Sequence, residues 1–353
     1  MLIKKLKVEN LRNLREVDIT PNPKLNVLFG GNGAGKTSVL ESIVVLSRGR
    51  SFRTSQADDL TGTSGKTFRV FAEIENTEKK SCRLGLERSG KHWRARKDGE
   101  DLTQLSQLSR ALPLVIMEPN SHLLVSGPPE IRRKYLDWGM FHVERDFLDI
   151  YRRYSKILKQ RNAALRSKQR GVLESIDEVI SNLGVSLTHM REKHLHAVTL
   201  QVRKTLEQLN PSLARVELDY DKGWKKDSLK KALFVSLEND IIRGATGAGP
   251  HRADIVMTLE RSQARSVLSR GEQKMLSAAL LLSQAEIFRA NGIVPIILMD
   301  DLASEFDQDH FESVLRKARE TGCQIWITGT GEYESKKDCT LFHVEHGIVR
   351  EMV

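Results

Sequence analysis

A glycine-rich segment near the N-terminus constrains this chain more than any other feature. Residues 30–37 read Gly-Gly-Asn-Gly-Ala-Gly-Lys-Thr and fit the pattern G-x-x-x-x-G-K-[ST]. An apolar stretch predicted as a strand, Leu25–Phe29, leads into the segment, and a predicted helix, Lys36–Leu46, follows it. Glycines let consecutive backbone N–H groups converge on phosphate oxygens, and the helix N-terminus adds partial positive charge. The segment therefore predicts a site for ATP or GTP rather than a chance glycine-rich turn.

The side chains of this loop have specific expected roles. The Lys36 ammonium is expected to bridge the β- and γ-phosphates and to take part in catalysis, and the Thr37 hydroxyl to ligate Mg²⁺. The expected nucleotide ligands of the loop are Gly30, Gly31, Asn32, Gly33, Ala34, Gly35, Lys36, Thr37 and Ser38.

A second apolar run, far downstream, ends in two carboxylates. Ile296–Met299 is followed by Asp300 and Asp301. A buried parallel strand delivers acids to the carboxyl edge of its sheet, where the Mg²⁺ of a P-loop site is held. We expect Asp300 to hold Mg²⁺, directly or through water, and Asp301 to polarise the attacking water. A strand that ends in a polar turn would be the default for this run alone, and the upstream P-loop disfavours that reading.

Between these two motifs, residues 268–273 read Leu-Ser-Arg-Gly-Glu-Gln and open a predicted helix. Ser269 and Glu272 form a capping box, which accounts for both residues without any ligand. The same segment resembles the signature of ABC-type ATPases, which closes on the γ-phosphate held by a second subunit. Residues 304–307, Ser-Glu-Phe-Asp, resemble their D-loop. On this resemblance, the expected ligands of the second subunit's nucleotide are Ser269, Arg270, Gly271 and Gln273.

Further segments resemble the RecF family within this class, over essentially the full length of the chain. They are Ala34–Ser51 with Phe52-Arg53, residues 127–137 (GPPEIRRKYLD), 159–166 (KQRNAALR) and 249–254 (GPHRAD), and Leu11-Arg12-Asn13. No sustained heptads lie between Lys36 and Ser269, so this stretch has room for a compact helical lobe but not for the coiled-coil arms of SMC-like proteins.

The resemblance implies an ATP-dependent DNA-binding protein of recombinational repair and replication. ATP and Mg²⁺ are the implied cofactors, and ATP binding is expected to close a homodimer with two composite sites on DNA near gaps. Hydrolysis would release the DNA. It is expected to be slow, because Asp301 stands where transporter-type ABC ATPases carry a longer Glu. Similar proteins work with RecR and RecO to place RecA on single strands and support the SOS response.

The predicted elements favour an α/β fold, an ABC-type P-loop ATPase head with a mixed sheet and an inserted helical lobe. Residues 1–117 are expected to form the N-terminal part of the ATPase lobe and residues 118–210 the helical lobe. Residues 211–353 are expected to complete the ATPase lobe with the signature, the paired acids and the D-loop.

Net charge is +10, which fits a polyanionic partner. The predicted helix Tyr151–Arg170 contains eight Lys or Arg and no Asp or Glu. The candidate DNA contacts are its clustered basic residues, Arg152, Lys156, Lys159, Arg166 and Arg170. The apolar residues Tyr151, Tyr154, Leu158 and Leu165 gather on roughly the opposite side. A solvated charged face is the alternative. A weaker basic cluster surrounds Trp93 and comprises Arg88, Lys91, Arg94, Arg96 and Lys97.

No apolar run approaches the ~18 residues of a spanning helix, and the first residues lack the apolar core of a signal peptide. We therefore expect a cytoplasmic, nucleoid-associated protein with no membrane partner. Two other functions share a P-loop. The ATPase subunit of an ABC transporter would carry Glu at position 301 and a switch histidine after Gln324–Thr328, where this chain offers Thr328 or Thr330. A small-molecule kinase would lack the signature.

Overall fold

The computed structural model describes residues 1–62, 66–76, 78–329 and 338–352, and the chain divides into two compact units. The first combines Met1–Ser121 with Gln284–Val353, and the second is His122–Ser283. The second unit is larger than the helical lobe expected at residues 118–210, because strands that follow this stretch pack against its helices. The signature segment accordingly lies in the second unit.

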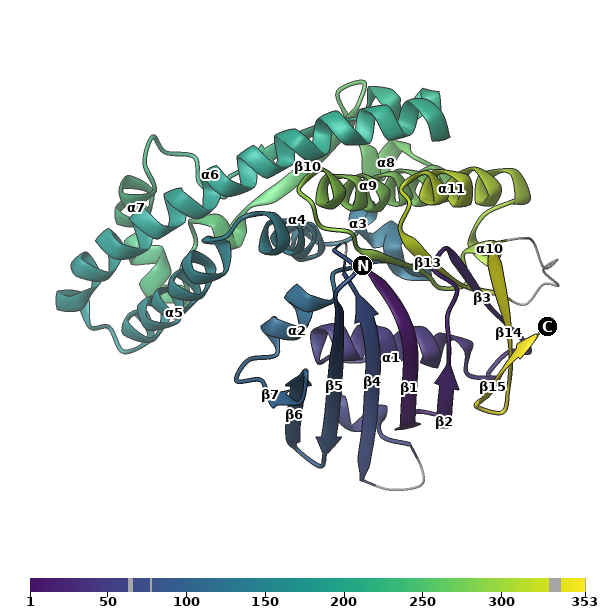
Figure 1. Cartoon of the computed structure of the whole chain (residues 1–353). Coiled ribbons are helices and arrows are strands. Elements are labelled where there is room, and N and C mark those ends of the chain that lie inside the picture. Colours follow the sequence, from purple (N-terminus) through teal and green to yellow (C-terminus); the bar gives the residue numbers. More distant parts are fainter. Residues whose placement is uncertain (63–65, 77, 330–337, 353) are drawn as a thin grey trace. The chain divides into compact units, whose positions relative to one another are not determined.

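One layer of the first unit is a six-stranded antiparallel sheet in the order β2-β1-β4-β5-β6-β7 (Figure 1). Apolar and polar residues alternate along its strands, so that one face is buried. In β4, for example, Phe68, Val70, Ala72 and Ile74 are buried. The strands are β1 (Leu2–Leu11), β2 (Leu14–Ile19), β4 (Thr67–Glu75), β5 (Ser81–Ser89), β6 (His92–Lys97) and β7 (Glu100–Asp101).

The other layer is a mixed sheet in the order β15-β14-β3-β13-β12-β8, parallel throughout except for β15. Its inner strands are continuous apolar runs, as expected for parallel strands covered on both faces. Because β3, β13, β12 and β8 are parallel, their carboxyl ends share one edge. The strands are β3 (Leu25–Phe29), β8 (Leu114–Met117), β12 (Ile296–Met299), β13 (Gln324–Gly329), β14 (Cys339–Glu345) and β15 (Ile348–Met352).

Helix α1 (Lys36–Arg48) packs between the two sheets. It contacts β1, β4 and β5 of the antiparallel sheet and β13 of the mixed sheet, and is buried nearly all round. Every residue of the run Val39–Leu46 is buried, and the run is apolar except for Glu41 and Ser42. The remaining helices of this unit are η1 (Ala57–Leu60), α2 (Ser106–Ala111), α10 (Leu302–Glu305) and α11 (Gln308–Glu320).

The second unit is mainly helical around the 40-residue helix α6 (Arg170–Leu209). The other helices are α3 (Leu123–Ser126), α4 (Pro129–Val143), α5 (Phe147–Arg166), η3 (Pro211–Arg215), α7 (Leu229–Arg243), η4 (Pro250–Arg252) and α8 (Ala264–Val267). A small sheet in the order β11-β10-β9 is formed by β9 (Glu217–Asp221), β10 (Asp254–Leu259) and β11 (Ser262–Gln263). Two helices cross the division between the units, η2 (Pro119–His122) and α9 (Arg270–Ala290). Among the described residues, no helix combines the length and apolarity needed to cross a membrane.

Buried arginines hold the second unit together. Arg161 of α5 is fully buried and binds Asp177 of α6 at 2.6 Å and Asp240 of α7 at 2.7 Å. Two further ion pairs of this kind are Arg132–Asp254 and Arg191–Asp137. Charged residues in the segments 127–137, 159–166 and 249–254 therefore have structural partners inside this unit.

Candidate nucleotide-binding site

The P-loop connects β3 to α1 and has a backbone that only glycine adopts easily. Gly30 has φ 148°, and a Cβ there would lie 2.2 Å from the Val344 carbonyl oxygen. Gly35 has φ 118° and caps the N-terminus of α1. Both positions lie in the region of φ that L side chains rarely adopt, which explains the glycines physically. The first amide groups of α1 thus open directly onto the loop, where an anion is stabilised.

The Lys36 ammonium is held over the loop. Its Nζ donates to the carbonyl oxygens of Gly30 at 2.8 Å and Gly31 at 2.9 Å. Burial lowers the pKa of Lys36, and the nearby carboxylates of Asp301 and Asp300 oppose that shift. The Lys36 ammonium already lies against the loop. It can therefore exchange the two carbonyl acceptors for phosphate oxygens with little movement.

The first acid predicted from the sequence meets the P-loop. The Thr37 hydroxyl donates to Asp300 Oδ1 at 2.9 Å, although the two residues are 263 positions apart. Burial raises the pKa of Asp300, whereas hydrogen bonds from Thr328 and Thr37 lower it. No cluster of three His, Cys, Asp or Glu that could hold a metal occurs in the described ranges. Mg²⁺ in nucleotide sites takes few protein oxygens and completes its shell with phosphates and water, so the Thr37 and Asp300 oxygens fit this ion.

The second acid has an unusual backbone. Asp301 is in the left-handed region with φ 52°, where a non-glycine residue costs of order 1–3 kcal/mol. Its backbone N–H donates to the Thr328 hydroxyl at 2.8 Å. Thr330, the other residue suggested in place of a switch histidine, lies outside the described residues.

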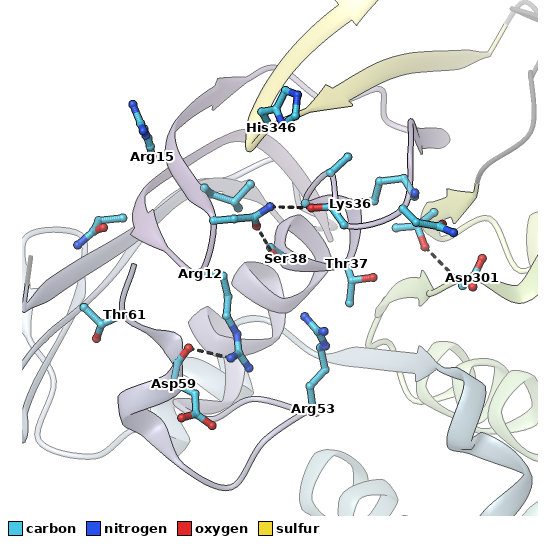
Figure 2. Close-up of a pocket in the computed structure, with 18 residues that line it drawn as sticks. Arg12, Arg15, Lys36, Thr37, Ser38, Arg53, Asp59, Thr61, Asp301 and His346 are labelled. Carbon is cyan, nitrogen blue, oxygen red and sulfur yellow. Dashed lines mark hydrogen bonds between the residues drawn. The ribbon is translucent and has the colours of Figure 1, made fainter. Parts of the chain in front are cut away.

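A cavity of about 770 Å³ opens in front of the P-loop (Figure 2). This volume is in the range of pockets that hold small ligands. Its walls include the loop and helix residues 32–38, together with Asp301 and Thr328. The sequence did not predict the remaining walls, which are Asn10, Arg12, Asn13, Leu14, Arg15, Arg53, Asp59, Thr61 and His346. Three of these, Arg12, Asn13 and Arg53, lie in segments already noted for their family resemblance.

The turn between β1 and β2 braces the P-loop. Asn13 donates through Nδ2 to the Gly33 carbonyl at 3.1 Å and accepts from the Ser38 hydroxyl at 2.9 Å. On the other side, the backbone N–H of Gly347 donates to the Ala34 carbonyl at 2.8 Å. Ser38, expected as a nucleotide ligand, therefore has its hydroxyl bound to Asn13.

A buried carboxylate organises the cations of the cavity wall. Glu41 of α1 is fully buried and accepts two hydrogen bonds from Arg12, at 2.8 and 2.9 Å. The Arg53 guanidinium lies 3.6 Å from the same carboxylate. Arg12 also donates to the Asp59 carbonyl, a contact that Figure 2 shows. Glu41 thus positions two cations at a cavity suited to phosphates.

A third acid, Glu118, follows β8 on the same sheet edge as Asp300. The backbone N–H of Asp300 donates to the carbonyl of Met117, so the two strand ends are in register. Burial raises the pKa of Glu118 to about 7; the Asp300 carboxylate adds to this shift and Arg48 opposes it. No local sequence pattern predicted a role for Glu118, because its proximity to Asp300 depends on strand order.

The signature segment begins α9 with the capping box that its sequence predicts. Ser269 donates through its backbone N–H and its hydroxyl to Glu272, both at 2.8 Å. Arg270 and Gly271 are exposed beside Ser269. Gln273, expected as a nucleotide ligand, is instead buried, and its amide donates to the Leu268 carbonyl at 2.9 Å. The first three residues are accessible to a second subunit, whereas Gln273 has a structural role.

The proposed DNA-contacting helix is interrupted. Helix α5 ends at Arg166 and α6 begins at Arg170, so the single helix Tyr151–Arg170 was a wrong prediction. Arg170 pairs with Glu238 of α7 at 2.7 Å, and Arg166 lies near the Gly244 carbonyl at 3.5 Å. The other three candidates, Arg152, Lys156 and Lys159, are exposed on α5. Tyr151, expected on the apolar side, is 38% exposed.

Three cations of the second basic cluster pair with nearby acids. Arg88 is buried and pairs with Asp58, and both Arg94 and Arg96 pair with Asp101. Since these acids offset the charge locally, this cluster is a poorer candidate for phosphate binding than α5.

Comparison with known proteins identifies relatives over the whole chain. A family model described as the RecF/RecN/SMC N-terminal domain matches residues 2–348. The DNA replication and repair protein RecF of Xanthomonas euvesicatoria pv. vesicatoria is 40% identical, with 98% of each chain covered. RecF of Pseudomonas putida is 36% identical over 99% of this chain and 98% of its own.

Solved structures agree with these relatives. The recombination mediator protein RecF with ATP, described as part of the RecFOR pathway, has a TM-score of 0.91 and 25% identity, covering 100% of this chain and 98% of its own. An Smc head bound to the C-winged helix domain of ScpA shares the fold, with a TM-score of 0.60, 13% identity and coverage of 100% of this chain and 97% of its own. The expected ABC-type ATPase head is therefore confirmed, and the chain belongs to the RecF family of DNA replication and repair proteins.

Proposed function

We propose that this protein is a slow, Mg²⁺-dependent ATPase that closes as a homodimer on DNA near single-strand gaps and opens after hydrolysis. The observation that carries the proposal is the contact of Thr37 with Asp300, which joins the P-loop to the paired acids. The structural similarity to RecF with ATP supports the same nucleotide. By the same relationship, RecR and RecO would be partners in placing RecA on single strands and in supporting SOS induction.

The residues of the site divide the chemistry between them. Bound Mg²⁺ supplies positive charge to the β- and γ-phosphates. Thr37 and Asp300 would hold the ion, and the Lys36 ammonium and the amides of the P-loop would bind the phosphate oxygens. Asp301 faces the same cavity and would orient the attacking water and accept its proton. The Asp301 side chain is shorter than the Glu that transporter-type ABC ATPases carry at this position, which suits slow turnover.

Dimer closure would complete each site from the other subunit. Ser269, Arg270 and Gly271 lie exposed at the start of α9, where backbone N–H groups and the helix dipole favour an anion. A γ-phosphate presented by a partner copy is the anion that this arrangement suits, and its loss on hydrolysis would open the dimer.

Affinity for DNA would come from phosphate contacts rather than from bases. The exposed cations Arg152, Lys156 and Lys159 of α5 support this role. The relatives are replication and repair proteins, which favours DNA over the membrane partner of a transporter subunit or the metabolite of a kinase.

The proposal is tested by binding to gapped duplex DNA with and without ATP, while the oligomeric state is measured by light scattering. ATP is expected to drive both dimerisation and DNA binding, and Lys36→Arg is expected to impair both responses, since a guanidinium cannot replace the point charge of the ammonium. DNA binding that is indifferent to ATP would contradict the switch, and a complete lack of DNA binding would contradict the repair function while leaving the ATPase site intact.

The basic surface of α5 makes a separate prediction. Replacing Arg152, Lys156 and Lys159 together by Gln is expected to weaken DNA binding at least ~10-fold and to reduce the salt dependence of binding by about two to three ions. Fluorescence anisotropy over a salt series measures both. The matched control is Arg94→Gln, Arg96→Gln and Lys97→Gln, which removes the same charge from β6. Equal losses in the two variants would contradict a local contact and indicate an effect of net charge alone.

A further inference from the structure

Thr328 occupies the central position on the carboxyl edge of the mixed sheet. Strand β13 lies between β3, which leads into the P-loop, and β12, which leads into the paired acids. The parallel register pairs Met299 with Ile327, so the next residues, Asp300 and Thr328, are neighbours across the strands. The Thr328 side chain is buried, with 1% of its surface exposed, yet it borders the nucleotide cavity.

The Thr328 hydroxyl connects the two acids. It donates a hydrogen bond to Asp300 Oδ1 at 2.8 Å and accepts one from the backbone N–H of Asp301 at 2.8 Å. The same Asp300 oxygen also accepts the Thr37 hydroxyl at 2.9 Å. When Thr37 serves a metal ion instead, Thr328 is the hydroxyl that continues to fix Asp300.

The hydrogen bond to Asp301 has a conformational consequence. Asp301 is in the left-handed region, and the direction of its side chain depends on that backbone conformation. Leaving this partly buried N–H without an acceptor would cost free energy, so the Thr328 hydroxyl stabilises the conformation that presents the Asp301 carboxylate to the cavity.

We propose that Thr328 is a positioning residue for ATP hydrolysis, which fixes the Asp301 carboxylate and the Asp300 carboxylate relative to each other through one hydroxyl. This inference rests on the proposed ATPase function and extends it. It assigns Thr328 a role different from that of a sensor of the γ-phosphate, because the hydroxyl proton is committed to Asp300 and is not available to donate to a phosphate oxygen.

The test compares Thr328→Val with Thr328→Ser. Valine keeps the shape of threonine without the hydroxyl, whereas serine keeps the hydroxyl. Thr328→Val is expected to lower kcat by about 10- to 100-fold with the Kd for ATP changed less than ~3-fold, and Thr328→Ser to restore kcat to within ~3-fold of wild type. Hydrolysis is followed by phosphate release and ATP binding by a fluorescent analogue, with circular dichroism as the check of folding. Thr328→Ala replaces Thr328→Val if the latter does not fold.

A double-mutant cycle decides whether Thr328 acts through Asp301. Adding Thr328→Val to Asp301→Asn is expected to cost less than the loss of about 10- to 100-fold that Thr328→Val causes alone, because residues that act as a unit are not additive. Independent, multiplying losses would overturn the proposal, as would wild-type kcat in Thr328→Val or a loss confined to ATP binding. A wild-type protein that does not hydrolyse ATP would instead overturn the proposed function, so the two failures are distinguishable.

Discussion

Replacing Asp301 by Asn is expected to leave ATP binding intact and to lower the rate of hydrolysis by at least about 100-fold, the contribution typical of a positioned general base. Asn tolerates the left-handed backbone that Asp301 has, with φ 52°, and it keeps the backbone N–H that binds Thr328. The substitution therefore removes the carboxylate charge and little else. Single-turnover hydrolysis and equilibrium ATP binding measure the two effects separately.

Two further observations sharpen this experiment. The variant is expected to accumulate as an ATP-bound dimer on DNA, because closure needs ATP and opening needs hydrolysis. Asp301→Glu is the matched control, since it retains a carboxylate and is expected to turn over measurably. Normal hydrolysis by Asp301→Asn would remove the role assigned to Asp301 and leave Glu118, the third acid of the same edge, as the next candidate.

Local sequence patterns predicted the centre of the site because its chemistry is local. The P-loop glycines are required by the backbone of one turn, and the paired acids follow one apolar strand. Their meeting, through Thr37 and Asp300, followed from the strand order of a known class. Local sequence patterns did not predict the other walls of the cavity. Arg15 reaches it from the start of β2 and His346 from the turn between β14 and β15, and tertiary packing, which no spacing in the sequence encodes, sets the position of both.

Charge patterns predicted the DNA-binding surface less reliably, because tertiary packing also decides which cations have acidic partners. The run of cations in Tyr151–Arg170 contains no acid, and we therefore predicted a surface of one sign. The acids that offset it come from other helices: Asp177 and Asp240 enclose Arg161, and Glu238 pairs with Arg170. A local charge count cannot detect partners that are 79 positions away, as Asp240 is from Arg161.

Replacing Arg161 by Met is expected to destabilise the second unit by about 3–5 kcal/mol, because it leaves two buried carboxylates without their cation. Asp240 is 2% exposed and Asp177 is 9% exposed, so water cannot fully compensate. A loss of this size corresponds to a fall in Tm of roughly 10 °C, which thermal unfolding measures directly. Lys156→Met is the control: it removes an exposed cation from the same helix and is expected to change stability by less than ~0.5 kcal/mol.

A second variant tests whether unpaired buried charge causes the loss of stability in Arg161→Met. Adding Asp177→Asn and Asp240→Asn to Arg161→Met removes the unpaired charges and is expected to recover part of the stability, since buried charge is the main cost. An Arg161→Met variant with the Tm of wild type would show that the ion pairs of Arg161 with Asp177 and Asp240 do not stabilise the fold. Below its melting transition, Arg161→Met is expected to bind DNA normally, whereas the triple Gln variant of Arg152, Lys156 and Lys159 folds normally and binds weakly. Normal DNA binding without Arg161 and weak DNA binding without the three exposed cations of the same helix would establish that burial, and not position in a basic run, decides which cations contact DNA.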